Sequence, residues 1–261
     1  MRSINVEELR TIQLDILKKT AEFCDLNKIT YFLAYGTLIG AIRHHGYIPW
    51  DDDIDIAMPR PDYDRFIKLF NEQESHIKVI SMENDKHYGF SFAKVHDIRT
   101  IINETQYKQD HFGVYIDIFP IDGVKDEKQV KILRMINKCL HTKKANYSQR
   151  KLSKKIINTF GKTLLLPFSS HTILKLIDYL ARIHPFGSTP FAGGICDSVV
   201  GKRAIVDVDI FKETLPHEFE GRQYRIPIGY DKWLRSIYGD YMQLPPVEKR
   251  TTHHVYLAYW K

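Results

Sequence analysis

The stretch "RHHGYIPWDDDIDIAMPRPDYDRF", from Arg43 to Phe66, sets the main constraint on how this chain folds. Four acids stand there within five positions: Asp51, Asp52, Asp53 and Asp55. Carboxylates this close repel one another. Apolar residues alternate with the end of the cluster, at Ile54, Ile56 and Met58, which is the pattern of a half-buried strand. The segment therefore places four carboxylates in or next to a half-buried strand. Such a concentration of negative charge needs a compensating positive charge.

Three interpretations of the acid cluster differ in what they explain. An exposed acidic turn accounts for the charges but not for the alternating isoleucines. An EF-hand loop would use Asp51, Asp53 and Asp55 at its first, third and fifth positions, but its sixth position needs a glycine and here is Ile56. On a strand, Asp53 and Asp55 share one face and can converge on a hard divalent cation, Mg²⁺ or Mn²⁺. We therefore expect a metal site, because a bound cation removes the repulsion.

Two further motifs carry groups that suit phosphate chemistry. In "VYIDIFPID", Asp117 stands between two isoleucines and can supply the third carboxylate of a two-metal site, with a strand-end cap as the alternative. In "YGTLIGAIR", Gly36 and Thr37 stand at a predicted strand-to-helix junction, where backbone N–H groups and the helix dipole can hold a phosphate. Together with the acid pair, these motifs predict a phosphate cradle beside three aspartates.

Three basic residues are candidate phosphate contacts. Lys94 lies in a predicted strand and Arg99 follows it, and the alternative for both is an outward-facing strand charge. Arg43 ends the helix predicted to start at Gly36, where it can favour the helix dipole or touch phosphate. The sequence does not choose between these roles.

Periodicity predicts an α+β (mixed α/β) chain. A helix with an Asn5–Glu8 capping box runs to about residue 26. The other elements expected in the first half are a strand at 30–36, a helix at 36–46, a strand at 53–58, a helix at 60–71, and strands at 76–82, 88–97, 100–105 and 113–122. Later we expect helices at 126–160, 170–184 and 231–239, and strands at 203–211 and 222–228. This change of character predicts two packed parts, 1–125 and 126–261.

Composition and charge narrow the classes of partner and compartment. The net charge of +6 and the pI near 9.0 favour an anionic partner. Seven Lys or Arg residues between Lys138 and Lys155 form either a solvated helix face or a surface for anionic lipid. Three cysteines with no C-x-x-C pair argue against a disulfide framework or a thiolate zinc site. The N-terminus shows no apolar h-region, so we expect a cytoplasmic protein, at most peripheral to the inner face of the membrane.

Two stretches resemble one known family. "YFLAYGTLIGAIRHHGYIPWDDDIDIAMPRPDYDRF" and the later "LRSIYGDYMQLPPVEKRTTHH" are similar to the LicD family, which includes the fukutin-related proteins and has the nucleotidyltransferase fold shared with DNA polymerase β. The resemblance implies a nucleotidyltransferase-like sheet flanked by helices in 1–125, and a basic helical lobe with C-terminal strands and a tail in 126–261. It also implies that Asp53, Asp55 and Asp117 are the catalytic, metal-binding acids. Asp51 matches a further family acid, and Gly36 and Thr37 match the donor-phosphate turn.

The resemblance also implies an activity. Bacterial family members transfer phosphocholine from CDP-choline to a sugar hydroxyl of teichoic acid, lipopolysaccharide or a related glycan and release CMP, with Mg²⁺ or Mn²⁺ as the expected cofactor. We expect a lipid-linked glycan acceptor and no nucleic acid. Aromatic faces suit a choline head group, which makes Trp50, Tyr115 and the tail candidates. His253 and His254 are candidate ligands or bases, with a surface location as the alternative.

Four alternatives stay open at this point. The donor can carry ribitol or glycerol phosphate instead of phosphocholine. An Asp-x-Asp glycosyltransferase also holds a nucleotide diphosphate through metal, but it has no need of Asp117 and usually has a longer nucleotide-binding region before the motif. A binding module without catalysis has no need of three metal ligands, and an ordinary nucleotidyltransferase would release pyrophosphate.

Overall fold

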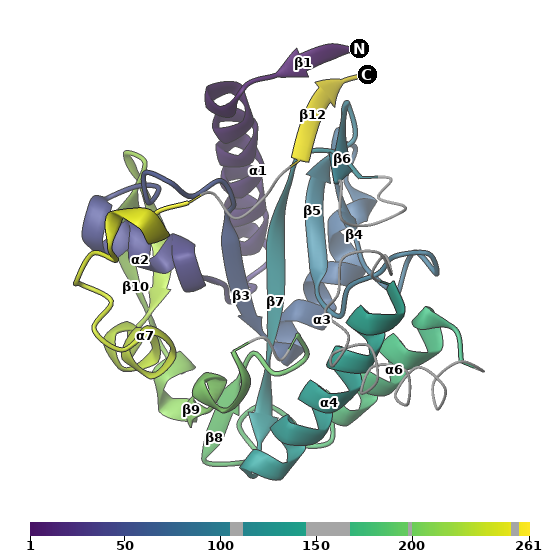
Figure 1. The fold of residues 1–261 in the computed structure, drawn as a ribbon, viewed down its shortest axis with the longest axis vertical. Coiled ribbons are helices and arrows are strands. Elements are labelled where there is room, and N and C mark those ends of the chain that lie inside the picture. Colours follow the sequence, from purple (N-terminus) through teal and green to yellow (C-terminus); the bar gives the residue numbers. More distant parts are fainter. Residues whose placement is uncertain (105–111, 145–167, 198–199, 252–255) are drawn as a thin grey trace.

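A central sheet organises the computed structural model of this chain, which describes residues 1–104, 112–144, 168–197, 200–251 and 256–261. Its strand order is β2-β3-β7-β5-β4, and β8 and β9 extend it from β7 (Figure 1). The strands are β2 (Phe32–Leu33), β3 (Asp55–Pro59), β4 (Ile77–Ile80), β5 (Ala93–Asp97), β7 (Tyr115–Val124), β8 (Phe191–Gly193) and β9 (Val206–Asp207). The pair β3–β7 is parallel and the other pairs of the sheet are antiparallel. The fold is therefore mixed α/β, as predicted.

Helices surround this sheet. They are α1 (Val6–Leu26), α2 (Tyr35–His44), α3 (Arg60–Leu69), α4 (Glu127–Lys144), α6 (Ser170–Ala181) and α7 (Tyr230–Tyr238). Short 3₁₀ turns cover Phe70–Glu72, Gly201–Ala204, Val208–Phe211 and Val247–Lys249. The start of α1 confirms the Asn5 half of the predicted capping box, because the Asn5 side chain accepts a hydrogen bond of 2.8 Å from the Glu8 backbone N–H. The Glu8 carboxylate accepts hydrogen bonds from Arg2 and Trp260 instead. Pro61 stands in the first turn of α3, where its missing N–H costs nothing.

Two smaller sheets complete the structure. In the first, β12 (Tyr256–Trp260) lies between β1 (Arg2–Ile4) and β6 (Thr100–Glu104), so both ends of the chain lie side by side at one end of the molecule (Figure 1). The second is the hairpin of β10 (Thr214–Phe219) and β11 (Arg222–Pro227). Strands late in the chain thus pair with or pack on strands from its beginning.

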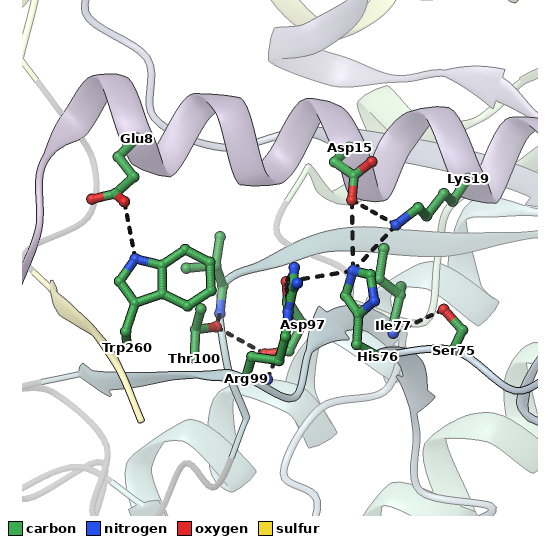
Figure 2. Close-up of polar contacts among 11 residues, drawn as sticks. Glu8, Asp15, Lys19, Ser75, His76, Ile77, Asp97, Arg99, Thr100 and Trp260 are labelled. Atoms are coloured by element: carbon green, nitrogen blue, oxygen red, sulfur yellow. Dashed lines mark hydrogen bonds and ion pairs between the residues drawn. The ribbon is translucent and has the colours of Figure 1, made fainter. Parts of the chain in front are cut away.

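A polar cluster joins α1 to β4, β5 and β12 (Figure 2). The indole N–H of Trp260 donates to Glu8 at 3.0 Å, and Lys19 forms an ion pair of 2.8 Å with Asp15. The Lys19 ammonium also lies 3.1 Å from Nε2 of His76. These contacts fix one side of α1 against β12 and the sheet. Arg10 and Gln13, which lie between Glu8 and Asp15 along the helix, reach the acid cluster described below.

Several predicted elements differ from the structure. The strand expected at 53–58 begins only at Asp55, and the strand expected at 88–97 begins at Ala93. The strand expected at 203–211 is wrong in most of its length, because after two residues of β9 the chain forms a 3₁₀ turn that buries Val208, Ile210 and Phe211. Strand β10 was not predicted; it contains a proline, which is tolerated there because β10 pairs on one side only.

The predicted change of character after residue 125 falls between β7 and α4. The second part contributes α4, α6 and α7, but it also contributes β8 to the central sheet and β12 to the sheet with the N-terminus. Aromatic packing crosses the boundary as well, since Phe32 stacks on Phe211 at 5.4 Å and meets Trp233 edge-on. The division into two parts stays a prediction.

Within the residues that the structure describes, none of the helices combines the length and the apolarity that a membrane crossing requires.

A buried ion pair ties α3 to the far half of β7. The Arg60 guanidinium donates two hydrogen bonds to Asp122, Nε to Oδ1 at 2.6 Å and Nη2 to Oδ2 at 2.7 Å. Both side chains are almost fully buried. A third bond, from Nη1 to Asp178 at 3.1 Å, brings in α6, and Arg182 donates to the other oxygen of Asp178. Since buried charges are tolerated only when paired, this network fixes how the helices sit at the end of β7.

Asp122→Ala should lower the free energy of unfolding by about 3–5 kcal/mol, because it leaves the Arg60 charge buried without its bidentate partner. Urea unfolding monitored by circular dichroism measures the loss. The double variant Arg60→Met with Asp122→Leu should recover most of it, since no uncompensated charge remains. Asp209→Ala, which removes an exposed carboxylate, is the matched control and should stay within about 0.5 kcal/mol. A loss below about 1 kcal/mol for Asp122→Ala would contradict this account.

Candidate active site

The parallel pair of β3 and β7 brings two aspartates together. Their register places Asp55 directly opposite Asp117, and the Asp117 backbone N–H donates to the Ile54 carbonyl at 2.9 Å. Both residues stand near the start of their strands, so their carboxylates share one edge of the sheet. The sequence separates these residues by more than 60 positions, and the parallel pairing removes that separation.

Three further aspartates form the turn that leads into β3. One carboxylate oxygen each of Asp51, Asp52 and Asp53 lies within 4.8 Å of the others. Burial and the neighbouring Asp53 raise the pKa of Asp51 to about 8. Burial, then Asp53, Asp117 and Asp51, raise the pKa of Asp55 well above its usual range. The acids therefore act on one another as a single cluster, and a cation placed among them would relieve the repulsion.

Helix α2 holds the backbone of this cluster. The Thr37 hydroxyl is buried and accepts a hydrogen bond of 2.8 Å from the Asp55 N–H. The Asp55 carbonyl in turn accepts from the Ala34 N–H at 3.0 Å, just before α2 begins. Thr37 thus positions Asp55, a role that the sequence did not indicate; a phosphate contact by this residue stays a prediction.

Helix α1 holds the cluster from the other side. Gln13, which is buried, donates from Nε2 to the Asp52 carbonyl at 2.9 Å, and its Oε1 accepts from the Tyr47 hydroxyl at 3.0 Å. One turn earlier, Arg10 donates from Nη2 to the Asp51 carbonyl at 2.7 Å. Its guanidinium also lies 4.7 Å from the centre of the Tyr47 ring. Neither Gln13 nor Arg10 belongs to a motif, so sequence reasoning missed both.

The first turn of α2 is shaped by the acids. A Cβ at Gly36 would lie 2.7 Å from Oδ2 of Asp51, so a side chain there would displace that carboxylate. The preceding residue, Tyr35, has a φ of 45°, in the left-handed region that bulky residues rarely adopt. Such strain concentrates at functional sites, where the surrounding structure enforces it. Glycine at position 36 is therefore explained by the approach of Asp51.

Lys94 lies inside the site rather than on the outside of the sheet. Its side chain is 2% exposed, and its Nζ donates to Oδ1 of Asp117 at 2.6 Å. The alternative of an outward-facing strand charge is wrong for this residue. The Nζ also lies 3.6 Å from the centre of the Tyr115 ring. Tyr115 is buried and this face of its ring already carries a cation, so the expectation that it offers an open face to choline is corrected.

The other predicted residues lie farther from the acids or outside the description. Arg43 donates to the Tyr241 carbonyl and to His44. Arg99 lies in the turn between β5 and β6. It forms an ion pair of 2.6 Å with Asp97, and its guanidinium lies over the Trp260 ring. In the described part of the chain, the contacts of Arg99 are therefore with these residues rather than with the acid cluster. His253 and His254, like most of the basic run from Lys138 to Lys155, lie outside the described residues.

Trp50 borders a cavity beside the acids. The cavity has a volume of about 190 Å³ and lies between the start of α1, β12 and the segment that precedes the cluster. Its lining includes Leu9, Arg10, Pro49, Trp50, Asp51 and Asp52. The Trp50 ring is partly exposed, and the Arg250 guanidinium lies 5.4 Å from its centre. The cavity therefore joins an aromatic face to two acids of the cluster.

A tyrosine from α7 also faces the acids. Burial, followed by the charges of Asp55, Asp51 and Asp53, raises the pKa of Tyr238. Tyr238 is nevertheless 44% exposed, so part of this residue reaches the surface near the acids. The only signal in the sequence was its place in the later family-like stretch, and the structure brings it to the site across almost 200 positions.

This arrangement of paired aspartates, a strained turn and a helix start agrees with a comparison of the sequence with known families. Residues 28–169 match the family described as "LicD/FKTN/FKRP, nucleotidyltransferase domain". The match covers more than half of the chain, so the chain belongs to the LicD family, as the motifs predicted.

One relative resembles the chain from end to end. It is the lipopolysaccharide cholinephosphotransferase LicD of Haemophilus influenzae, with 34% identity over 267 residues that cover 99% of both proteins. Two uncharacterized proteins match shorter parts. The one from Rickettsia typhi is 31% identical over 43% of this chain and 39% of its own length. The one from Rickettsia prowazekii is 33% identical over 32% of this chain and 27% of its own length.

Two glycines of α2 separate a site effect from a fold effect. Gly36→Ala should change the melting temperature by less than about 3 °C, since alanine favours a helix and its Cβ meets only a carboxylate end. It should weaken Mn²⁺ binding at least about tenfold by displacing Asp51. Gly40→Ala should do the opposite, because its Cβ would lie 2.4 Å from the Gly46 carbonyl oxygen and destabilise the fold.

Differential scanning calorimetry and isothermal titration of each variant with MnCl₂ measure the two effects. Unchanged Mn²⁺ affinity in a folded Gly36→Ala protein would contradict the assignment of Asp51 to the site.

Proposed function

We propose that this chain transfers phosphocholine from CDP-choline to a sugar hydroxyl of a cell-surface glycan and releases CMP. Full-length similarity to a protein named lipopolysaccharide cholinephosphotransferase supports this and favours lipopolysaccharide over teichoic acid or a capsule precursor as the acceptor. The observation that carries the proposal is the pairing of Asp55 with Asp117 beside Asp51 and Asp53. Few purely structural arrangements place four carboxylates at one sheet edge.

The residues of the cluster fit a divalent cation. Asp51, Asp52 and Asp53 offer carboxylate oxygens close to one another, and these are the ligands that Mg²⁺ and Mn²⁺ prefer. Burial, followed by the neighbouring carboxylates, raises the pKa values of Asp51 and Asp55, so a bound cation would stabilise their charged forms. Asp53 and Asp55 would hold the metal, with Asp51 beside them. When bound, it supplies positive charge against the donor diphosphate and the departing CMP.

The remaining groups have roles that follow from their positions. The acceptor hydroxyl oxygen attacks the phosphorus of phosphocholine, and the bond from that phosphorus to the oxygen of CMP breaks. Asp117, on the strand beside Asp55, accepts the proton of the attacking hydroxyl. Backbone N–H groups at the start of α2, next to Gly36, hold the donor phosphates. The main contributions of the protein are then to position the donor and the acceptor and to stabilise the negative charge of the reacting phosphates.

The choline head group needs an aromatic face near the acids. Trp50 meets that need, because it borders a cavity shared with Asp51 and Asp52. We also propose that the protein acts in the cytoplasm on a lipid-linked acceptor, with basic surface near the anionic membrane as a point of contact. CDP-ribitol or CDP-glycerol as donor is the second candidate, favoured by the breadth of the matched family, which includes fukutin-type proteins.

Purified protein with CDP-choline, MnCl₂ and a choline-free lipopolysaccharide should release CMP, measured by liquid chromatography, and attach phosphocholine to the glycan, measured by mass spectrometry. Asp53→Asn should lower CMP release at least about 100-fold with an unchanged melting temperature, because it removes a ligand for metal and donor phosphate. Asp209→Asn, an exposed aspartate far along the chain, is the matched control and should retain full activity.

Parallel reactions with CDP-ribitol, CDP-glycerol and UDP-sugars test the alternatives. Release of pyrophosphate or transfer from a UDP-sugar would replace the proposal with a nucleotidyltransferase or a glycosyltransferase. A fully active Asp53→Asn protein would exclude the metal assignment.

A further inference from the structure

Four aromatic rings surround the ammonium of Lys94. Its Nζ lies 3.6 Å from the ring centre of Tyr115, 4.7 Å from Phe90, 5.3 Å from Phe92 and 5.5 Å from Phe112. All four distances lie within the range of cation–π attraction. The rings also contact one another, with Phe90 packed on both Phe92 and Phe112. Together they form an aromatic cage, defined here as Phe90, Phe92, Phe112 and Tyr115.

The cage directs the lysine toward one acid. Lys94 is 2% exposed, so its charge is removed from bulk water and needs a partner of opposite sign. Strand pairing sets Lys94 directly opposite Asp117 in the β5–β7 ladder, and Nζ lies 2.6 Å from Oδ1. A buried, paired and ring-enclosed ammonium cannot swing away as an exposed lysine does. Its position beside Asp117 is therefore fixed by the fold.

This position is the one that a second metal ion would need. In two-metal phosphoryl-transfer sites the ions lie about 3.5–4 Å apart and share a bridging carboxylate. A magnesium ion on Oδ1 of Asp117 would stand about 2.1 Å from that oxygen. It would then lie within about 5 Å of the Lys94 ammonium and be repelled by it. Asp117 consequently offers a metal at most its other carboxylate oxygen, Oδ2.

We propose that Lys94 is the resident second cation of this site: it positions Asp117, and the acid cluster binds one divalent ion rather than two. The inference rests on the metal-dependent reaction proposed above. It makes Lys94 a positioning residue, because it acts through Asp117 rather than on the substrate. It also gives the cage a purpose other than choline recognition, since the cage is closed and already holds a cation.

Counting bound Mn²⁺ tests the proposal. Isothermal titration and electron paramagnetic resonance of the whole chain with MnCl₂, with and without CMP, should give one ion per molecule. Lys94→Met keeps an unbranched side chain in the cage but removes the charge. It should bind the first Mn²⁺ about tenfold more tightly or better, since a repelling charge is lost, and it should gain a second site. Its CMP release should fall, because Asp117 loses its partner.

Two controls keep the outcome interpretable. Lys94→Arg retains the positive charge and should keep the one-ion stoichiometry, and the melting temperature of each variant reports whether it is folded. Two ions in the unchanged protein, or one ion with unchanged affinity in a folded Lys94→Met protein, would overturn the role of Lys94 and leave the proposed reaction standing. No Mn²⁺ binding by the unchanged protein, with or without CMP, would overturn both the metal site and this inference.

Discussion

Repulsion among carboxylates at the start of β3 is the constraint on which the rest of the site depends. Asp55 and Asp117 face each other across a parallel strand pair, and Asp51 and Asp53 approach from the preceding turn. The surrounding contacts either reduce the repulsion among these carboxylates or hold the backbone that carries them in place. Thr37 and Gln13 bind the backbone on both sides, and Lys94 supplies one positive charge. A chain that kept these acids only for stability would replace them, because apolar residues at the same positions would be more favourable.

The sequence predicted the features that depend on local pattern. The cap at Asn5, the extents of α1, α2 and α3, and the apolar strands β3 and β7 all follow from periodicity and capping chemistry. Two motifs more than 60 residues apart also indicated that Asp55 and Asp117 belong together, since each lies in an alternating strand. The family was predicted from contiguous stretches, and the match over residues 28–169 confirms it.

Features that depend on tertiary contact were not predicted. Nothing near Lys94 in the sequence shows that four rings from two segments enclose it, so an exposed strand charge was an equal alternative. Tyr115 was a candidate because an aromatic face suits choline, yet the residue is buried and the Lys94 ammonium lies against its ring. Strand β10 was missed because its proline argues against a strand unless one edge is unpaired. For Lys94 and Tyr115, part of the deciding environment comes from a strand more than 15 residues away in the chain.

Helix α1 holds the acid cluster in place although it lies outside the range matched by the family model. The family match begins at residue 28, after α1 has ended. Arg10 and Gln13 of that helix nevertheless donate hydrogen bonds to the backbone carbonyls of Asp51 and Asp52. Contacts between residues so far apart in the sequence form late in folding, because closing the intervening loop lowers the chain entropy before the stabilising contacts are made. The position of the acids thus depends on contacts from outside the matched range: a fragment limited to residues 28–169 would keep every acid of the cluster and lose the hydrogen bonds from Arg10 and Gln13.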